Sequence, residues 1–205
     1  MLPLIVDLTG KKVVVFGGGE VGLRKARYFA DEAEVAVVSR EFTDGFQAER
    51  VRLVRSDAVE ALEDWVDWAD CVIAATDDSA VNERICAAAR SRGKQYNRAD
   101  GKGSFLIPSV IDRGNFIVAI STLGRSPAVS RRLKEELERM IPEEWASMVR
   151  LQEELREDAK RLLPDQPSRE AFLRSVLEDG EVFEALKDDY DFAKRLALRK
   201  LEGGE

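Results

Sequence analysis

Residues 13–22 read Val13-Val14-Val15-Phe16-Gly17-Gly18-Gly19-Glu20-Val21-Gly22, an apolar strand-like run that leads directly into a glycine-rich turn, and a helix-compatible segment follows at 23–29. Gly17 permits a tight turn off the strand, Gly19 lets the backbone approach a pyrophosphate, and Gly22 lets the helix pack close to the sheet. The unpaired N–H groups at the start of that helix suit phosphates. The stretch therefore predicts a dinucleotide-binding turn, with a plain strand-to-helix turn as the alternative.

Strand and helix patterns alternate through the first half of the chain. We expect strands at 13–16, 35–38, 51–54 and 71–75, and helices at 21–29 and 80–90, the second capped by Asp78 or Ser79 and ended by Gly93. Nearly continuous apolar strands separated by helices indicate a parallel sheet that is covered on both faces. The sequence predicts an α/β fold.

The pattern changes after Asp100. Strand-like segments at 105–108 and 116–120 flank a turn at 112–115, and they either extend the sheet or begin a second unit. A helix should begin at Ser126-Pro127 and carry an apolar stripe at 129, 133, 137 and 140/141. From 143 onward the pattern is helical, with a stripe over 145–162, a break at 164–167 and two further helices around 179–180.

Composition excludes several classes of function. The chain has 205 residues, 44% of them hydrophobic, and a formal net charge of −7, which argues against general nucleic-acid binding. It has no histidine, so Ser-His-Asp chemistry, Cys-His pairs and imidazole metal sites are excluded. Cys71 and Cys86 lack metal-site spacing and read as buried reduced thiols without a catalytic role.

Location follows from the same reading. No apolar run approaches the roughly 20 residues that cross a bilayer, and the start of the chain lacks the features of a signal peptide. We therefore expect a cytoplasmic protein.

Several short sequence motifs occur together over about 130 residues. They are Pro3-Leu4, Gly17-Gly18-Gly19 with Arg24-Lys25, Ala74-Ala75-Thr76-Asp77-Asp78 with Asn82, Asn97 with Asp100, Phe105 with Pro108, and Ile120-Ser121-Thr122 followed by Gly124, Ser126 and Pro127. In this combination and order the chain resembles the precorrin-2 dehydrogenase family, the stand-alone or N-terminal module of sirohaem synthase. The run from Thr76 to Asn82 and the Ser-Thr-x-Gly-x-Ser-Pro stretch are the most specific parts.

The resemblance implies an architecture and a reaction. It implies a Rossmann-type NAD-binding domain at 1–112, a dimerisation region at 113–142, a small helical C-terminal domain at 143–205, and a homodimer. The reaction it implies is NAD-dependent oxidation of precorrin-2 to sirohydrochlorin, and in some members the same pocket inserts ferrous iron to give sirohaem. We expect no counterpart in this protein of the methyltransferase that is fused to some relatives.

The cofactor expected is NAD, although the end of the second strand is unusual. Many NAD enzymes hold the ribose hydroxyls with Asp or Glu there, whereas this chain has Ser39-Arg40. An arginine could meet the 2′-phosphate of NADP instead, but the resembling family tolerates a non-acidic residue at this point. The residues expected to contact the cofactor are Gly17, Gly19, Glu20, Val21, Gly22, Ser39, Arg40, Thr76 and Asp77.

Asp100 is the candidate catalytic residue. It follows a strand-like segment, 95–97, and lies in a loop where open α/β sheets build their sites. From the residues alone an Asp beside two glycines is more often a turn former, and the resemblance is what favours catalysis. Proton transfer in this protein must fall to carboxylate, Lys, Tyr or Cys groups, because histidine is absent.

A tetrapyrrole with many carboxylates needs local positive charge on an acidic protein. The basic loop residues Arg98, Lys102, Arg113 and Arg125 are candidates, or are solvated surface charges, and we favour Lys102 and Arg125. Arg24-Lys25 contact phosphates or substrate, or lie on an exposed helix face. The residues expected to contact substrate are Asn97, Lys102, Arg125 and Ser126, and no metal site is expected.

Three other interpretations of the sequence exist. Tyr190 and Lys194 have the Tyr-x-x-x-Lys spacing of short-chain dehydrogenases, but they fall in a terminal charged helix, where ordinary helix spacing explains them. A Rossmann fold alone does not fix a function, so a non-catalytic NAD(H)-sensing regulatory protein is the main alternative to an enzyme. A chelatase without redox activity is the second.

Overall fold

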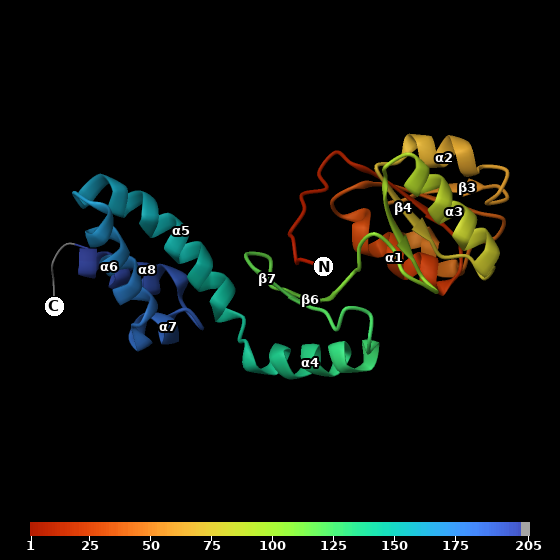
Figure 1. The fold of residues 1–205 in the computed structure, drawn as a ribbon. Coiled ribbons are helices and arrows are strands. Elements are labelled where there is room, and N and C mark those ends of the chain that lie inside the picture. Colours follow the sequence, from red (N-terminus) through yellow and green to blue (C-terminus); the bar gives the residue numbers. More distant parts are fainter. Residues whose placement is uncertain (202–205) are drawn as a thin grey trace. The chain divides into compact units, whose positions relative to one another are not determined.

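The computed structural model describes residues 1–201 and falls into two compact units, Met1–Ile107 and a second that begins at Pro108 (Figure 1). The division of the second part into a dimerisation region and a helical domain, with boundaries after 112 and 142, stays a prediction.

The first unit is built on a five-stranded parallel sheet with the strand order β3-β2-β1-β4-β5. The expected parallel sheet and α/β fold are confirmed, and a helix follows most strands. The elements in chain order are β1 (Lys12–Phe16), α1 (Glu20–Ala30), β2 (Glu34–Ser39), the 3-10 helix η1 (Asp44–Ala48), β3 (Arg52–Arg55), α2 (Leu62–Trp68), β4 (Cys71–Ala74), α3 (Ser79–Ser91) and β5 (Gln95–Arg98).

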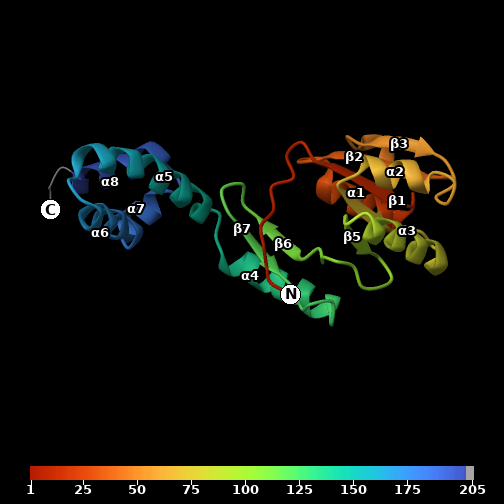
Figure 2. The same cartoon turned by 45° about the horizontal axis from the view of Figure 1, so that its top comes forward.

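The inner strands β2, β1 and β4 are buried on both faces of the sheet. Successive side chains of each strand point to opposite faces. Val13 and Val15 of β1 pack with the apolar face of α1. Val14 and Phe16 of the same strand pack with α2 and α3. Figure 2 shows the sheet from a second direction, with α1, α2 and α3 around it.

The start of α3 is capped as expected. The Asp78 carboxylate accepts the backbone N–H groups of Ala80, at 2.7 Å, and Val81, at 3.1 Å. The helices α2 and η1 have no counterpart among the elements expected from the sequence. The two cysteines, Cys71 and Cys86, are buried and free, as expected.

One expected strand is wrong. Residues 105–108 do not form a strand, and β6 (Ser109–Asp112) begins directly after Pro108. Proline has no backbone N–H for a strand ladder, and Phe105 and Ile107 instead pack against the core beneath α1. The segment is therefore a core-filling connection between the two units.

The second unit opens with a hairpin. β6 pairs antiparallel with β7 (Ile117–Ile120) in a separate two-stranded sheet, so these strands do not extend the first one. The expected turn at 112–115 joins them. Gly114 has a φ of +77°, a left-handed value that glycine adopts without strain, and its N–H donates to the Asp112 carboxylate at 2.7 Å.

The remaining helices follow the expected pattern. α4 starts with Ser126 as its N-cap and Pro127 as its first residue, and α5 carries the apolar stripe, of which Met148, Leu151 and Leu155 are fully enclosed. These side chains pack with α6, α7 and α8, which lie together on one side of α5 in Figure 1. The helices are α4 (Pro127–Met140), α5 (Glu144–Leu162), α6 (Gln166–Leu177), α7 (Gly180–Ala185) and α8 (Tyr190–Leu201).

Tyr190 and Lys194 both lie in α8. The Lys194 ammonium donates to the Glu154 carboxylate of α5 at 2.7 Å. The ion pair of Lys194 and Glu154 therefore joins α8 to α5 within the second unit. This agrees with the interpretation that ordinary helix spacing explains Tyr190 and Lys194.

Candidate functional site

The carboxyl edge of the five-stranded sheet brings together the expected site residues of the first unit. β1 lies between β2 and β4, so the chain leaves β1 toward one side of the sheet and returns to build β4 and β5 on the other. Open α/β sheets bind ligands in the crevice at such a switch point. The loops after β1, β2, β4 and β5, which carry Gly17, Arg40, Thr76 and Asp100, all end at this edge.

The glycine turn has the form that a pyrophosphate requires. Gly17 has a φ of +124°, and a Cβ there would meet the Ala75 carbonyl oxygen at 2.2 Å. A Cβ on Gly22 would meet the Gly17 oxygen at 1.9 Å, so the helix lies directly against the turn. A Cβ on Gly19, the exposed N-cap of α1, would meet nothing within 4 Å. The open side of the turn therefore faces outward at Gly19, beside the N–H groups of the helix, and the residues present fit a dinucleotide.

The next residues lie around this turn. The Glu20 carboxylate accepts the Thr43 hydroxyl at 2.8 Å, which ties the start of α1 to the loop after β2, and Val21 is exposed. Ser39 ends β2 below Gly18, whose added Cβ would meet the Ser39 hydroxyl oxygen at 2.8 Å. Arg40 has a largely exposed side chain whose Nε lies 4.0 Å from the Asp57 carboxylate. Arg40 is therefore accessible to a ligand at the end of β2.

The loop after β4 is held from within. The Thr76 N–H and hydroxyl both donate to the Asn82 side-chain oxygen, at 3.0 and 2.8 Å, and the Asn82 amide donates back to the Thr76 carbonyl at 3.0 Å. Asn82 is buried although it is polar, and these bonds satisfy it. Asp77, the next residue, is exposed. Asn82 thus fixes the backbone that would border a nicotinamide ribose.

Asp100 is an ionised carboxylate at the same edge. The Arg98 guanidinium donates to it from Nε, at 2.6 Å, and from Nη2, at 3.3 Å. This hydrogen bond from Arg98 is the main reason that the pKa of Asp100 lies well below its usual range, and Ser79 and Asn82 contribute in the same direction. Two of the roughly four lone-pair directions of a carboxylate are used by Arg98, so the group can still accept a proton or a hydrogen bond.

Asn97, expected to contact substrate, lies beneath the surface. It is 3% exposed, its oxygen accepts the Lys25 ammonium at 3.0 Å, and its amide donates to the Phe105 carbonyl at 3.0 Å. Burial lowers the pKa of Lys25, with Arg24 acting in the same direction. Lys25 was expected to contact phosphates or substrate, or to lie on an exposed helix face. In the structure its ammonium points inward and joins α1 to β5 through Asn97. Lys102 is exposed in the loop after Asp100.

The other basic and substrate candidates belong to the second unit. Arg125 is exposed in the turn before α4, and the Ser126 hydroxyl accepts the Val129 N–H as the cap of that helix, at 3.3 Å. The Arg113 guanidinium donates to the carbonyls of Glu138, at 3.3 Å, and Ile141, at 3.4 Å, near the end of α4. Arg113 therefore has a structural role in this unit.

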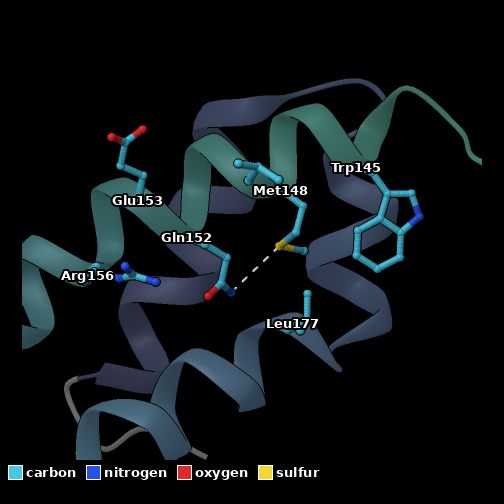
Figure 3. A pocket seen from close by; sticks show the side chains of 7 residues that line it. Trp145, Met148, Gln152, Glu153, Arg156 and Leu177 are labelled. Carbon is cyan, nitrogen blue, oxygen red and sulfur yellow. Dashed lines mark hydrogen bonds between the residues drawn. The ribbon is translucent and has the colours of Figure 1, made fainter. Parts of the chain in front are cut away.

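A hollow of about 430 Å³ lies in the helical part of the second unit (Figure 3). Trp145, Met148 and Gln152 of α5 and Leu177 of α6 line it, and the Gln152 amide also donates to the Leu173 carbonyl at 3.0 Å. None of the expected cofactor or substrate residues lines this hollow.

Two features are absent from residues 1–201. In that range no group of three or more cysteine or carboxylate side chains is arranged to hold a metal ion. Across the same residues, every helix falls short of the length or the apolar character needed to cross a membrane.

Comparisons with known proteins agree with the fold and the turn. Residues 4–109 match the sequence model of a family described as putative NAD(P)-binding. The chain is 40% identical over 204 residues to the precorrin-2 dehydrogenase of Methanosarcina barkeri, an alignment that covers 96% of this chain and 91% of the relative. The chain belongs to the precorrin-2 dehydrogenase family. The first unit is accordingly an NAD(P)-binding domain of that family.

A longer relative and a solved structure are also similar to this chain. The siroheme synthase of Azotobacter vinelandii is 34% identical over 98% of this chain, but the chain spans only 44% of that longer protein. Among solved structures, SirC, a precorrin-2 dehydrogenase, matches with a TM-score of 0.76 and 26% identity over 99% of this chain and 100% of that one. The Rossmann-type fold and the suspected family are thereby confirmed.

Sequence reasoning missed the surroundings of Asp100. Arg98 appeared there only as a loop cation for substrate, whereas it ends β5 and holds the Asp100 carboxylate. The spacing Arg-x-Asp across a strand end is a weak signal for such a contact. The anchoring of Arg98 on α3, at Ser79 and Glu83, joins residues 15 to 19 positions apart and has no local signature.

Proposed function

We propose that this protein oxidises precorrin-2 to sirohydrochlorin with NAD as hydride acceptor. The observation that carries the proposal is the similarity along nearly the whole chain to a relative named precorrin-2 dehydrogenase. The geometry supports it, because a dinucleotide turn and an ionised carboxylate share one edge of the sheet. A dehydrogenase needs both, one to position the cofactor and one to receive a proton.

The glycine turn and its neighbours would hold the cofactor. The open side of Gly19 and the N–H groups of Glu20 and Val21 suit the pyrophosphate. Ser39 and Arg40 would hold the adenosine ribose, and Thr76 and Asp77 would hold the other ribose. Bound NAD would supply the hydride acceptor. Arg40 carries positive charge where many NAD enzymes carry a carboxylate, so NADP is the cofactor to compare.

Asp100 would accept the proton that leaves with the hydride. It stays ionised throughout the neutral range because Arg98 stabilises its charged form, and it retains acceptor directions that Arg98 does not use. A base must lie within hydrogen-bond reach of the proton it removes, so its fixed position matters as much as its pKa.

The carboxylates of the substrate need cations. Lys102 and Arg125 are exposed basic residues that we propose for this role, and a guanidinium or ammonium suits the charge of a propionate or acetate group. Ser126 and Asn97 have structural partners, Ser126 in the cap of α4 and Asn97 with Lys25. We propose that these two act by fixing the backbone near the substrate.

We propose that the protein works as a homodimer. The apolar stripe of α4 remains uncovered, with Val129 48%, Leu133 41% and Met140 74% exposed, and Ile117 of β7 is 44% exposed. Contiguous exposed apolar side chains of this kind mark interfaces, and a second copy of the chain offers a self-complementary one. We also propose that the reaction takes place in the cytoplasm, where the free thiols of Cys71 and Cys86 stay reduced.

The test is an anaerobic incubation of purified protein with precorrin-2, with and without NAD. We expect the absorption spectrum of sirohydrochlorin to develop only with both protein and NAD. Tight NAD binding without conversion of precorrin-2 would favour the alternative, an NAD(H)-sensing regulatory protein. An insertion of iron into sirohydrochlorin is measured in the same preparation, without NAD.

A further inference from the structure

Arg98 and Asp100 form a two-point ion pair at the end of β5. The guanidinium donates through Nε and through Nη2 to the two different oxygens of the Asp100 carboxylate. The Arg98 side chain is only 14% exposed, whereas that of Asp100 is 35% exposed. A planar guanidinium that meets both oxygens fixes the carboxylate in distance and in orientation.

Arg98 is itself fixed by the first turns of α3. Its Nη2 donates to the Ser79 carbonyl, at 3.1 Å, and to the Ser79 hydroxyl, at 2.9 Å. Its Nη1 donates to the Glu83 carboxylate. The guanidinium therefore lies between a helix and a loop, with most of its donors used, and a change of rotamer would break several hydrogen bonds together.

We propose that Arg98 is a positioning residue, which holds the Asp100 carboxylate in place for proton transfer by fastening it to β5 and to the start of α3. This inference rests on the proposed function of Asp100. It assigns to Arg98 a task other than contact with the carboxylates of the substrate, because its donors face Ser79, Glu83 and Asp100.

The effects of position and of basicity on the rate have opposite signs. Arg98 from β5 is the cation in contact with the Asp100 carboxylate, and Glu83 from α3 accepts from the same guanidinium. Removal of Arg98 would raise the pKa of Asp100 toward the ordinary value and make Asp100 a stronger base. If a variant without Arg98 turns over more slowly, the cause is therefore that the Asp100 carboxylate is no longer held in position, since the change in basicity alone would not slow the reaction.

The variants are Arg98→Gln, Arg98→Lys and the control Arg92→Gln. Arg92 also meets two carboxylates, Glu63 and Asp67, and is 25% exposed, but it follows the end of α3. That end of the helix lies at the opposite edge of the sheet, because α3 runs antiparallel to the strands it connects. The two arginines thus differ in location but are alike in their contacts.

We expect Arg98→Gln to lower kcat by about 10- to 100-fold, since a misplacement of about 1 Å can cost about 100-fold. Its Kd for NAD should stay within about twofold of the wild type. Arg98→Lys should recover part of the rate, because an ammonium retains one contact. Arg92→Gln should keep the wild-type rate. An unchanged or higher kcat in folded Arg98→Gln would overturn the proposal.

A measurement without substrate separates this inference from the proposed function. In the wild type, the ¹³C signal of the Asp100 carboxyl, assigned with Asp100→Asn, should remain that of the ionised form down to about pH 3.5. In Arg98→Gln it should titrate at a higher pH than in the wild type, closer to the ordinary value for Asp of about 3.9. An ordinary titration in both proteins would overturn the contact on which the proposal rests. If the wild type binds NAD but does not convert precorrin-2, the proposed function fails, and the role of Arg98 in proton transfer fails with it even where the titration moves.

Discussion

Gly19 and Gly22 should fail in different ways when they are replaced. A Cβ on Gly22 would lie 1.9 Å from the Gly17 oxygen, whereas real Cβ contacts below 3.0 Å are essentially absent, so strand end and helix must separate by about 1.1 Å. Overpacking of this kind costs about 1–3 kcal/mol. At about 4 °C per kcal/mol, Gly22→Ala should lower Tm by about 4–12 °C.

Gly19 should behave as a pure binding position. A Cβ there meets nothing within 4 Å, and its φ of −83° is open to any residue. The loss of a neutral N-cap costs at most about 1 kcal/mol, and the lower entropy of the unfolded chain offsets part of it. A larger side chain would occupy the approach of the pyrophosphate, so Gly19→Val should weaken NAD binding by on the order of 100-fold, or about 3 kcal/mol.

Calorimetry and thermal melts of both variants decide the matter, with Gly19→Ala as the matched small substitution. The expected result is a folded Gly19→Val protein with a near-normal Tm and little NAD affinity, beside a less stable Gly22→Ala protein. Undiminished NAD affinity in folded Gly19→Val would refute the assignment of the turn.

Four further outcomes are expected. Asp100→Ala should keep its NAD affinity and lose about 10²- to 10⁴-fold in turnover. Because the pKa of Asp100 is lowered in the folded protein, its carboxylate should stay ionised as pH falls from 7 to about 5. A wild-type loss of activity in that range, traced by NMR to protonation of Asp100, would contradict the lowered pKa. Leu133→Asp should turn a dimer into a monomer of 23.0 kDa in light scattering, and a wild-type monomer would remove the proposed interface. NAD should bind more tightly than NADP, and a reversed order that Arg40→Ala abolishes would mean that Arg40 selects the 2′-phosphate. Insertion of Fe²⁺ or Co²⁺ into sirohydrochlorin should be slow or absent, since a chain without histidine offers carboxylate, thiol or water ligands, and fast insertion that survives Asp100→Ala would show that this chemistry lies elsewhere.

The parallel sheet could be predicted from sequence because each of its inner strands is apolar on both faces. Val13 to Phe16 fill the cores on both sides of the sheet, which is the burial that a continuous apolar run indicates. The same reasoning failed at 105–108, where Phe105 and Ile107 are apolar because they fill the core below α1 while Pro108 cannot join a ladder. The apolar pattern of residues 105–108 therefore reflects burial of side chains in the core and not strand pairing.

The site was predictable where it depends on local backbone and less so where it depends on distant side chains. The spacing of Gly17 and Gly22 predicts the turn. A Cβ at either position would clash with a backbone oxygen, which explains why both residues are glycine. Asp100 was identified through family resemblance, but its partner Arg98 and the anchor at Ser79 depend on how α3 returns along the sheet. Propensity and periodicity carry no information on such contacts.

The most direct test of the account is the coupling of cofactor reduction to substrate oxidation. In anaerobic reactions of wild-type protein with precorrin-2 and NAD, NADH and sirohydrochlorin should form in equimolar amounts and at the same rate. At an NAD concentration below the Kd of the wild type, Gly19→Val and Asp100→Ala, both folded, should form both products slower than the wild type by about 100-fold or more. Sirohydrochlorin formation without matching NADH, or at the wild-type rate in Gly19→Val, would contradict hydride transfer to a dinucleotide held at the glycine turn.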